Sequence, residues 1–180
     1  MYYEDLERWT REELSSHLST LLAQEQLNHD DDLSLVFPVS IDTSSVLGGI
    51  TDATPATLPQ YAIDCESKEL AAASEDGWLY DYSGQITIMV WADRADKVDA
   101  ICRRHVAAVE RWINSHMHPG YSKDGHFMII EMRYSSTIFA GAIPLQQSTA
   151  QNPDAVDSWI AGADINLAWR LSESGPSQVD

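Results

Sequence analysis

The segment GQITIMVWADRADKVDAICRRHVAAVERWI, at positions 84–113, constrains the fold more than any other part of the chain. Its first residues alternate at the period of a β-strand, with Ile86, Ile88 and Val90 on one side and Thr87, Met89 and Trp91 on the other. Asp93 ends the strand and is placed to cap a helix, and Asp96 favours the positive end of the helix dipole. Apolar residues then recur at helical spacing: Val98, Ile101, Cys102, Val106, Val109, Trp112 and Ile113. The segment predicts a strand leading into an amphipathic helix, the unit of a sheet covered by helices.

The residues before position 43 predict a helix and a strand. Thr10 and Glu13 form the pattern of a capping box, which predicts a helix that begins there and continues to about Leu27. Alternation over residues 35–41 predicts a strand, and Pro38 places it at an edge of the sheet because proline cannot donate a ladder hydrogen bond.

The next residues predict a loop and a hairpin. Residues 43–59 are rich in Ser, Thr, Gly and Pro, which is typical of a long loop. Tyr61, Ile63 and Cys65 alternate as a short strand, and an acidic connection over residues 66–82 joins it to the strand at 86–91. We expect these two strands to form an antiparallel hairpin.

The C-terminal third predicts two further strands. Residues 127–134 read as a strand after a turn, and residues 165–171 alternate cleanly as another. Residues 135–158 show no clear period and predict a long loop, which in a compact domain is usually functional. Residues 172–180 form a polar tail that we expect to fray.

Together these elements predict a single α+β domain over residues 1–180, with a mostly antiparallel sheet of four to five strands and two main helices on one face. Met89 and Trp91 lie on the second face of that sheet. They require cover from a loop or from another subunit, and an incompletely covered sheet face is what an oligomer interface supplies.

The charge balance excludes one class of function. The formal net charge is −17 and the isoelectric point is near 4.4, which opposes a surface that grips nucleic-acid phosphates. Five cationic residues nevertheless share the helix that follows position 93: Arg94, Lys97, Arg103, Arg104 and Arg111. This basic face is either a solvated helix surface with ordinary ion pairs or a set of contacts to a neighbouring molecule.

Cysteine usage and hydropathy limit the compartment. Cys65 and Cys102 are too few for a disulfide framework, lie in apolar patterns and fit a reducing compartment. The N-terminus lacks the pattern of a signal peptide, and no segment is long and apolar enough to span a bilayer, so we expect no membrane association.

No pattern in the sequence predicts catalysis or a cofactor. His116, His118 and His126 could gather around a metal, but no carboxylate or cysteine completes the set, and we interpret them as surface histidines of a turn. His29 and the acidic residues 30–32 lack the spacing of a calcium loop. His105 is interpreted as a residue at the boundary of the apolar stripe. The sequence therefore predicts a protein that is not an enzyme, with no metal and no cofactor.

Four segments carry a resemblance to a known family. They are the helix at 10–27, LPQYAID at 58–64, the strand and helix start at 84–101, and ADINLAWRL at 163–171. In this order they resemble the tail terminator, or tail completion, family of long-tailed bacteriophages, and they cover most of the chain.

The resemblance implies an α+β subunit of a six-membered ring at the head-proximal end of a phage tail. Such a ring stops tail-tube polymerisation and joins the tail to the neck. Its partners are further copies of itself, the tail tube protein and a neck or head-closure protein, and it belongs to the virion after assembly in the host cytoplasm. The alternatives are another neck or head-closure connector and a soluble, non-enzymatic adaptor that acts as a monomer.

The acidic charge gains a meaning in such a ring. Six copies carry a formal charge of 6 × −17 = −102, and part of it would face a channel that DNA passes through without specific binding. Acidity that serves solubility alone is the other interpretation.

Nine residues are the expected partner contacts. Met89 and Trp91 are expected on a buried second sheet face. Arg103, Arg104 and Arg111 are expected to pair with carboxylates of an adjacent copy, from residues 66–81. The remaining four are expected to anchor the 135–158 loop either on a neighbouring ring or on the protein's own sheet: Ile138, Phe139, Ile143 and Leu145.

Overall fold

The computed structural model describes residues 3–29, 31–43, 54–74, 77–123, 127–145 and 158–174. It contains two helices and six strands: α1 (Tyr3–Leu27), β1 (Ser40–Thr43), β2 (Gln60–Ser74), β3 (Gly77–Ala92), α2 (Ala95–Ser115), β4 (Tyr121–Lys123), β5 (Phe127–Leu145) and β6 (Ser158–Ser174). The strands form one sheet in the order β1-β2-β3-β6-β5-β4, in which β1 and β2 are parallel and all other neighbours are antiparallel. The expected α+β class is confirmed, and the short β4 is an addition to the expected strands.

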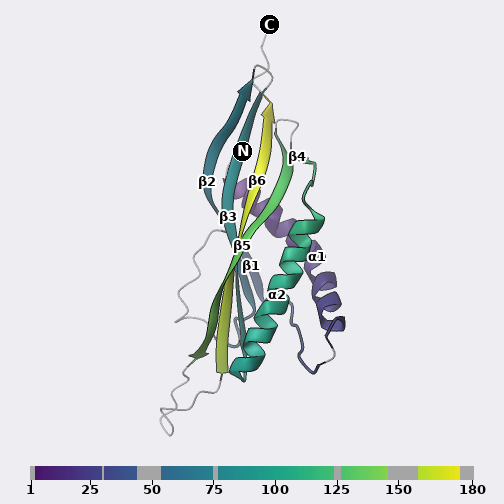
Figure 1. The fold of residues 1–180 in the computed structure, drawn as a ribbon, viewed down its shortest axis with the longest axis vertical. Helices are drawn as coiled ribbons and strands as arrows, with labels where there is room; N and C mark the ends of the chain where they lie inside the picture. Colours follow the sequence, from purple (N-terminus) through teal and green to yellow (C-terminus); the bar gives the residue numbers. More distant parts are fainter. Residues whose placement is uncertain are drawn as a thin grey trace.

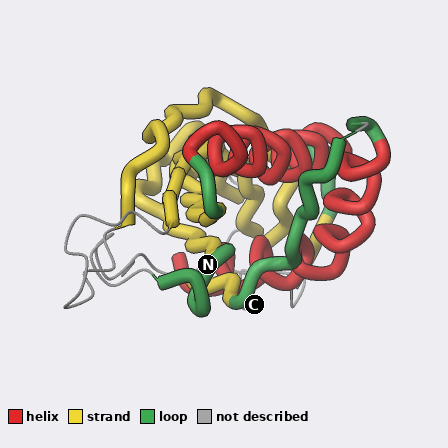
Figure 2. Tube along the Cα trace, turned by 90° about the horizontal axis from the view of Figure 1, so that it is seen from below, coloured by secondary structure: helices red, strands yellow, loops and turns green. Residues whose placement is uncertain are grey.

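Both helices pack on the same face of the sheet, as Figures 1 and 2 show. Helix α2 contacts β3, β5 and β6, and α1 contacts α2, β1 and β2. The main core lies between these layers and is rich in large residues that are fully buried: Leu6, Leu14, Leu18, Tyr61, Ile63, Tyr82, Ile86, Ile88, Trp112, Ile113, Ile129 and Trp169. The prediction of two helices on one face is therefore confirmed, and no helix of the described residues lies on the other face of the sheet.

The four central strands are long, with 15 to 19 residues each. At a rise of about 3.3 Å per residue, they span roughly 50–60 Å. Figure 1 shows that they extend beyond α2 at the upper end. The sheet is therefore an elongated blade, only part of which is covered by helices.

The β2–β3 hairpin is confirmed as antiparallel, but the prediction of an acidic connection over residues 66–82 was wrong. The pairing continues from Cys65 and Gly84 outward to Ser74 and Gly77, so nearly all of that connection is strand. Its outer part, SKELAAAS in β2, has no apolar alternation because this end of the blade extends away from the core.

The prediction of a loop over residues 135–158 was also wrong for its first half, because β5 continues to Leu145 and pairs with β6. Residues 146–157 lie outside the described residues. The pairing of β5 with β6 shifts register at three places, between Ile129 and Glu131, Tyr134 and Ser136, and Ala140 and Ile143. Each shift breaks the two-residue period, which explains why the sequence shows no strand pattern there.

Helix α1 begins seven residues earlier than the expected capping box. Thr10 lies inside the helix, and its hydroxyl donates a hydrogen bond of 2.8 Å to the carbonyl of Leu6. This is the back-bonding pattern of a mid-helix threonine and not a cap.

Helix α2 has the expected extent, but its cap differs. Arg94 occupies the N-cap position without a side-chain capping hydrogen bond, and Asp93 instead forms an ion pair of 3.1 Å with Lys97. Asp96 lies in the first turn, as expected for the helix dipole.

The strand expected at 35–41 is shorter and later than predicted. Strand β1 covers only Ser40–Thr43, although its expected position at the edge of the sheet is confirmed. The backbone N–H of Val39 donates to the carbonyl of Pro59 at 2.7 Å, which ties the segment before β1 to the start of β2.

Cys65 and Cys102 are buried free thiols, as expected from their apolar surroundings. Burial raises the pKa of both thiols to about 12, which makes them unreactive near neutral pH.

In the part of the chain that the structure describes, neither helix has the length and apolar character that crossing a membrane requires.

Candidate functional site

The sheet face opposite the helices, which we call the open face, is the main candidate for an interaction site. Strand pairing arranges its side chains in rows across β3, β6 and β5. The rows are Trp91–Ile160–Ile143, Met89–Gly162–Ala140, Thr87–Asp164–Ile138, Gln85–Asn166–Ser136, Ser83–Ala168–Arg133 and Asp81–Arg170–Glu131. The open face therefore changes along its length from an apolar end to a charged end.

The apolar end is covered only in part. Met89 is 6% exposed and Ile160 is 2% exposed, because they form a small cluster with Leu58 and the half-buried Leu145. Thus Met89 is covered by residues of its own chain, one of the two alternatives expected. Trp91, in contrast, remains 36% exposed.

The four apolar residues expected to anchor a loop all lie in strand β5. Ile138 and Ile143 lie on the open face and are 62% and 41% exposed. Phe139 lies on the helix side, where the guanidinium carbon of Arg103 is 4.7 Å from its ring centroid. Leu145 packs against the cluster around Met89. Part of the set therefore packs on the protein's own sheet, and Ile138 and Ile143 remain open to a partner.

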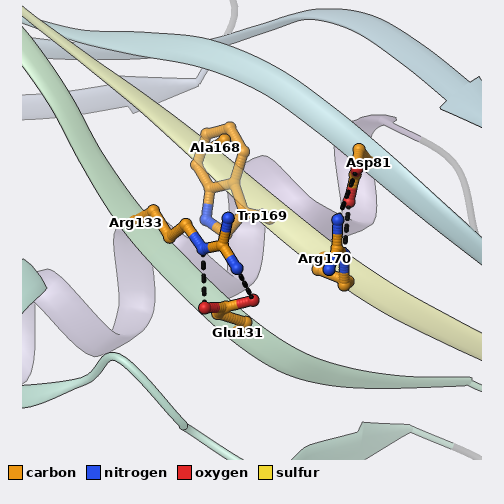
Figure 3. Close-up of a pocket in the computed structure, with 6 residues that line it drawn as sticks. All are labelled: Asp81, Glu131, Arg133, Ala168, Trp169 and Arg170. Carbon is orange, nitrogen blue, oxygen red and sulfur yellow. Dashed lines mark hydrogen bonds and ion pairs between the residues drawn. The ribbon is translucent and has the colours of Figure 1, made fainter. Parts of the chain in front are cut away.

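The charged end carries two bidentate ion pairs, drawn in Figure 3. Arg170 of β6 donates to Asp81 of β3 at 2.7 and 2.8 Å, and Arg133 donates to Glu131 within β5 at 2.6 and 2.7 Å. Each guanidinium lowers the pKa of its carboxylate partner, Arg170 that of Asp81 and Arg133 that of Glu131. Each ion pair is neutral overall, so this end of the open face carries no concentrated charge of either sign.

The middle of the open face is polar and hydrogen-bonded. The hydroxyl of Thr87 donates to the Asp164 carboxylate at 2.6 Å across β3 and β6. The amide of Asn166 donates to the Ser136 hydroxyl at 3.1 Å across β6 and β5. These bonds join the three strands across the open face.

The basic residues of α2 have partners within the chain. Arg104 is buried and forms a bidentate ion pair with Asp31, with one N–O distance of 2.9 Å. Arg111 forms an ion pair with Glu25 and donates to Gln24 at 3.4 Å. The pairs expected with residues 66–81 of another copy are thus replaced, for these two arginines, by pairs that fasten the end of α1 and the following residues to α2.

His105 is fully buried and does not lie at the boundary of the apolar stripe, as the sequence suggested. Its Nδ1 atom lies 2.6 Å from the hydroxyl of Tyr61, and its Nε2 atom has no hydrogen-bond partner among the described residues. Burial lowers the pKa of His105 to about 4 and raises that of Tyr61 well above its usual value. Both groups are therefore neutral at physiological pH, and neither reaches the surface.

The sequence predicts that the histidines after α2 are surface residues of a turn. His118 is exposed and its Nδ1 lies 3.3 Å from the carbonyl of Ile130, and His126 lies outside the described residues. His116 instead lies beside Glu13 and His17 of α1. The sequence signal for this group is the four-residue spacing of Glu13 and His17 on a helix, which was missed because His116 is far away in the chain.

The acidic segment that follows α1 has structural partners. His29 lies 4.0 Å from Glu25, and Asp31 is held by Arg104. Asp30 lies outside the described residues.

The sequence matches no protein-family model and no curated protein. Among solved structures, a chain described as "Virion of native gene transfer agent (GTA) particle" is similar, with a TM-score of 0.42 and 14% identity over 86% of this chain and 92% of that chain. A similarity of this size assigns no function to the chain.

Proposed function

We propose that the chain is a structural subunit of a phage-like particle that forms a ring at the head-proximal end of the tail, where it ends tube polymerisation and joins the tail to the neck. The observation that carries the proposal is the pair of exposed apolar residues Trp91 and Ile143, which flank the buried Ile160 in one row of a sheet face that no described helix covers. A hydrogen-bonded sheet surface with exposed large apolar residues is typical of a subunit interface.

A second copy of the chain is the proposed occupant of the open face. The resemblance of the sequence to tail terminators implies a ring of identical subunits. A ring requires a head-to-tail contact, in which the open face of one subunit meets a different surface of the next. The strands of the blade are long enough for such a contact to include both the apolar end and the paired charges.

The chemistry of the described residues supports a structural role. On the open face, Arg133 and Arg170 are engaged by carboxylates, and Thr87 and Asn166 are engaged by neighbouring strands. His105 and Tyr61, the buried pair, are neutral and enclosed.

The tail tube and a neck protein are the further partners that the proposal assigns to the two ends of the ring.

The charge of the chain supports passage of DNA without binding. The net charge is −17, and two of the arginines of α2 are engaged by Asp31 and Glu25. A channel lined by such subunits repels the phosphate backbone and does not release counterions from it.

Replacing Trp91 by aspartate tests the proposal. The carboxylate would be buried without a partner in the interface, so the ring should dissociate to monomers, which sedimentation velocity measures directly. Because Trp91 is 36% exposed in the single chain, circular dichroism of the variant should stay unchanged.

Leu27→Asp is the matched control. Leu27 is a large apolar residue at the end of α1, 86% exposed and away from the open face. Its replacement should leave the assembly intact. Rings of full mass in the Trp91 variant, or equal loss of assembly in both variants, would contradict the assignment of the open face.

A further inference from the structure

Three potential metal ligands come together where α1 crosses the C-terminal end of α2. They are a carboxylate oxygen of Glu13, a ring nitrogen of His17 and a ring nitrogen of His116, and all three lie within 4.8 Å of one another. Glu13 and His17 are four residues apart on α1, so they project from the same face of the helix. His116 is the C-cap residue of α2, 99 positions after His17.

We propose that Glu13, His17 and His116 form a binding site for a divalent transition metal of the zinc class. Two imidazoles and one carboxylate are a ligand set that zinc accepts, with water in the fourth position. Imidazole ligands also select against magnesium and calcium, which prefer oxygen donors.

The hydrogen bonds of both rings prepare them for this role. Nδ1 of His17 lies 2.8 Å from the carbonyl of Glu13, and Nδ1 of His116 lies 2.9 Å from the carbonyl of Trp112. The hydroxyls of Ser16 and Ser115 lie 2.8 and 3.0 Å from the same Nδ1 atoms and donate to the same two carbonyls. A carbonyl only accepts, so the tautomer that satisfies both contacts of each ring carries its proton on Nδ1. The neutral ring then has its lone pair on Nε2, where it can bind a metal, and the carbonyl contact fixes the tautomer as outer partners of zinc ligands do.

The surroundings permit the small movement that coordination requires. Zinc bonds of about 2.1 Å place tetrahedral ligands about 3.4 Å apart, which is closer than the present separation. His17 is exposed, and Glu13 and His116 are only half-buried, so their side chains can rotate without disturbing the core. The rings of His17 and His116 are already in edge-to-face contact, with centroids 4.8 Å apart.

A bound metal would fasten α1 to the end of α2. Trp112, one turn before His116, is fully buried, and its ring centroid lies 5.4 Å from that of the His116 ring. The second ligand element is therefore anchored in the core. Metal binding should stabilise the folded chain because the unfolded chain does not hold the three ligands together.

The test uses the untagged full chain and zinc chloride alone, with magnesium chloride for comparison. We expect calorimetry to show one zinc ion per chain. We also expect melting temperature to rise by about 5 °C or more when zinc exceeds its dissociation constant roughly 100-fold. His17→Ala and His116→Ala should each weaken binding at least about tenfold and remove most of the thermal shift, and Glu13→Gln should weaken it less.

His118→Ala is the matched control, because His118 is an exposed histidine of the same turn that lies outside the group. It should bind zinc as the unchanged chain does. Absence of zinc binding overturns the proposal. Binding that survives both His17→Ala and His116→Ala overturns it too, because the metal then lies elsewhere.

Discussion

Replacing Gly84 by alanine should destabilise the protein strongly. A Cβ atom at this position would lie 2.1 Å from the backbone carbonyl oxygen of Asp64 and 2.9 Å from the ring of Trp169. The first neighbour is backbone of the paired strand β2, and the second is a fully buried indole of β6. Relief therefore requires separation of two strands, at a cost of about 3 kcal/mol or more.

Urea unfolding followed by circular dichroism measures this cost. A loss of this size is a large share of the about 5–15 kcal/mol that stabilises a typical domain, so the midpoint should fall sharply or the variant should be partly unfolded without urea. Gly141→Ala is the control, because a Cβ atom added in that part of β5 meets no atom within 4 Å. Equal midpoints for the two variants would show that β2 and β3 are not paired as described.

Acidification should destabilise the protein through His105. Burial lowers its folded-state pKa to about 4, whereas an unfolded histidine has a pKa of about 6.5. Between these values the unfolded state binds a proton that the folded state does not, so stability falls as pH falls through this window. The difference of roughly 2.5 pKa units corresponds to about 3 kcal/mol, and above pH of about 7 the group contributes no slope.

Unfolding free energies measured from pH 7 to pH 4 check this effect. Other groups also titrate there, including Glu7, whose pKa is raised by burial, and Asp31, whose pKa is lowered by its hydrogen bonds with Arg104. The informative quantity is therefore the difference between the unchanged chain and His105→Gln, which retains a polar partner for Tyr61 but does not titrate. That difference should shrink steadily with falling pH.

His118→Gln is the matched control for the pH dependence, since His118 is exposed. The free energy of unfolding of the His118→Gln variant should follow that of the unchanged chain at every pH. A constant offset between the unchanged chain and His105→Gln from pH 7 to pH 4 would contradict the assignment of the neutral buried histidine.

The elements that the sequence predicts well are those whose apolar period matches their burial. Helix α2 and the second half of β3, from Gly84 onward, both place one regular apolar face in the main core. The first part of β3, over residues 77–82, fell within the predicted acidic connection. Strand β5 has 19 residues, but its three register shifts hide its period. The outer part of β2 lacks a strand pattern in the sequence for another reason. It extends away from the core and therefore has no apolar side.

The site is less predictable because it depends on contacts between distant parts of the chain. The alternation of β3 identifies Met89 and Trp91 as residues of a second face, but their exposure is decided by Leu58 and by the β6 register. The partner of Arg104 is Asp31, which lies 73 positions away on a segment without regular structure. A charge pattern along one helix therefore reveals cations but not what binds them.

The mass of the purified chain in solution, measured over a range of concentrations, tests the central proposal most directly. If the open face joins identical subunits, the protein should form a species several times heavier than the 20.1 kDa chain, and electron micrographs of that species should show closed rings. A mass of 20.1 kDa at every concentration, with no rings in the micrographs, would contradict the proposed ring subunit and favour a monomeric adaptor.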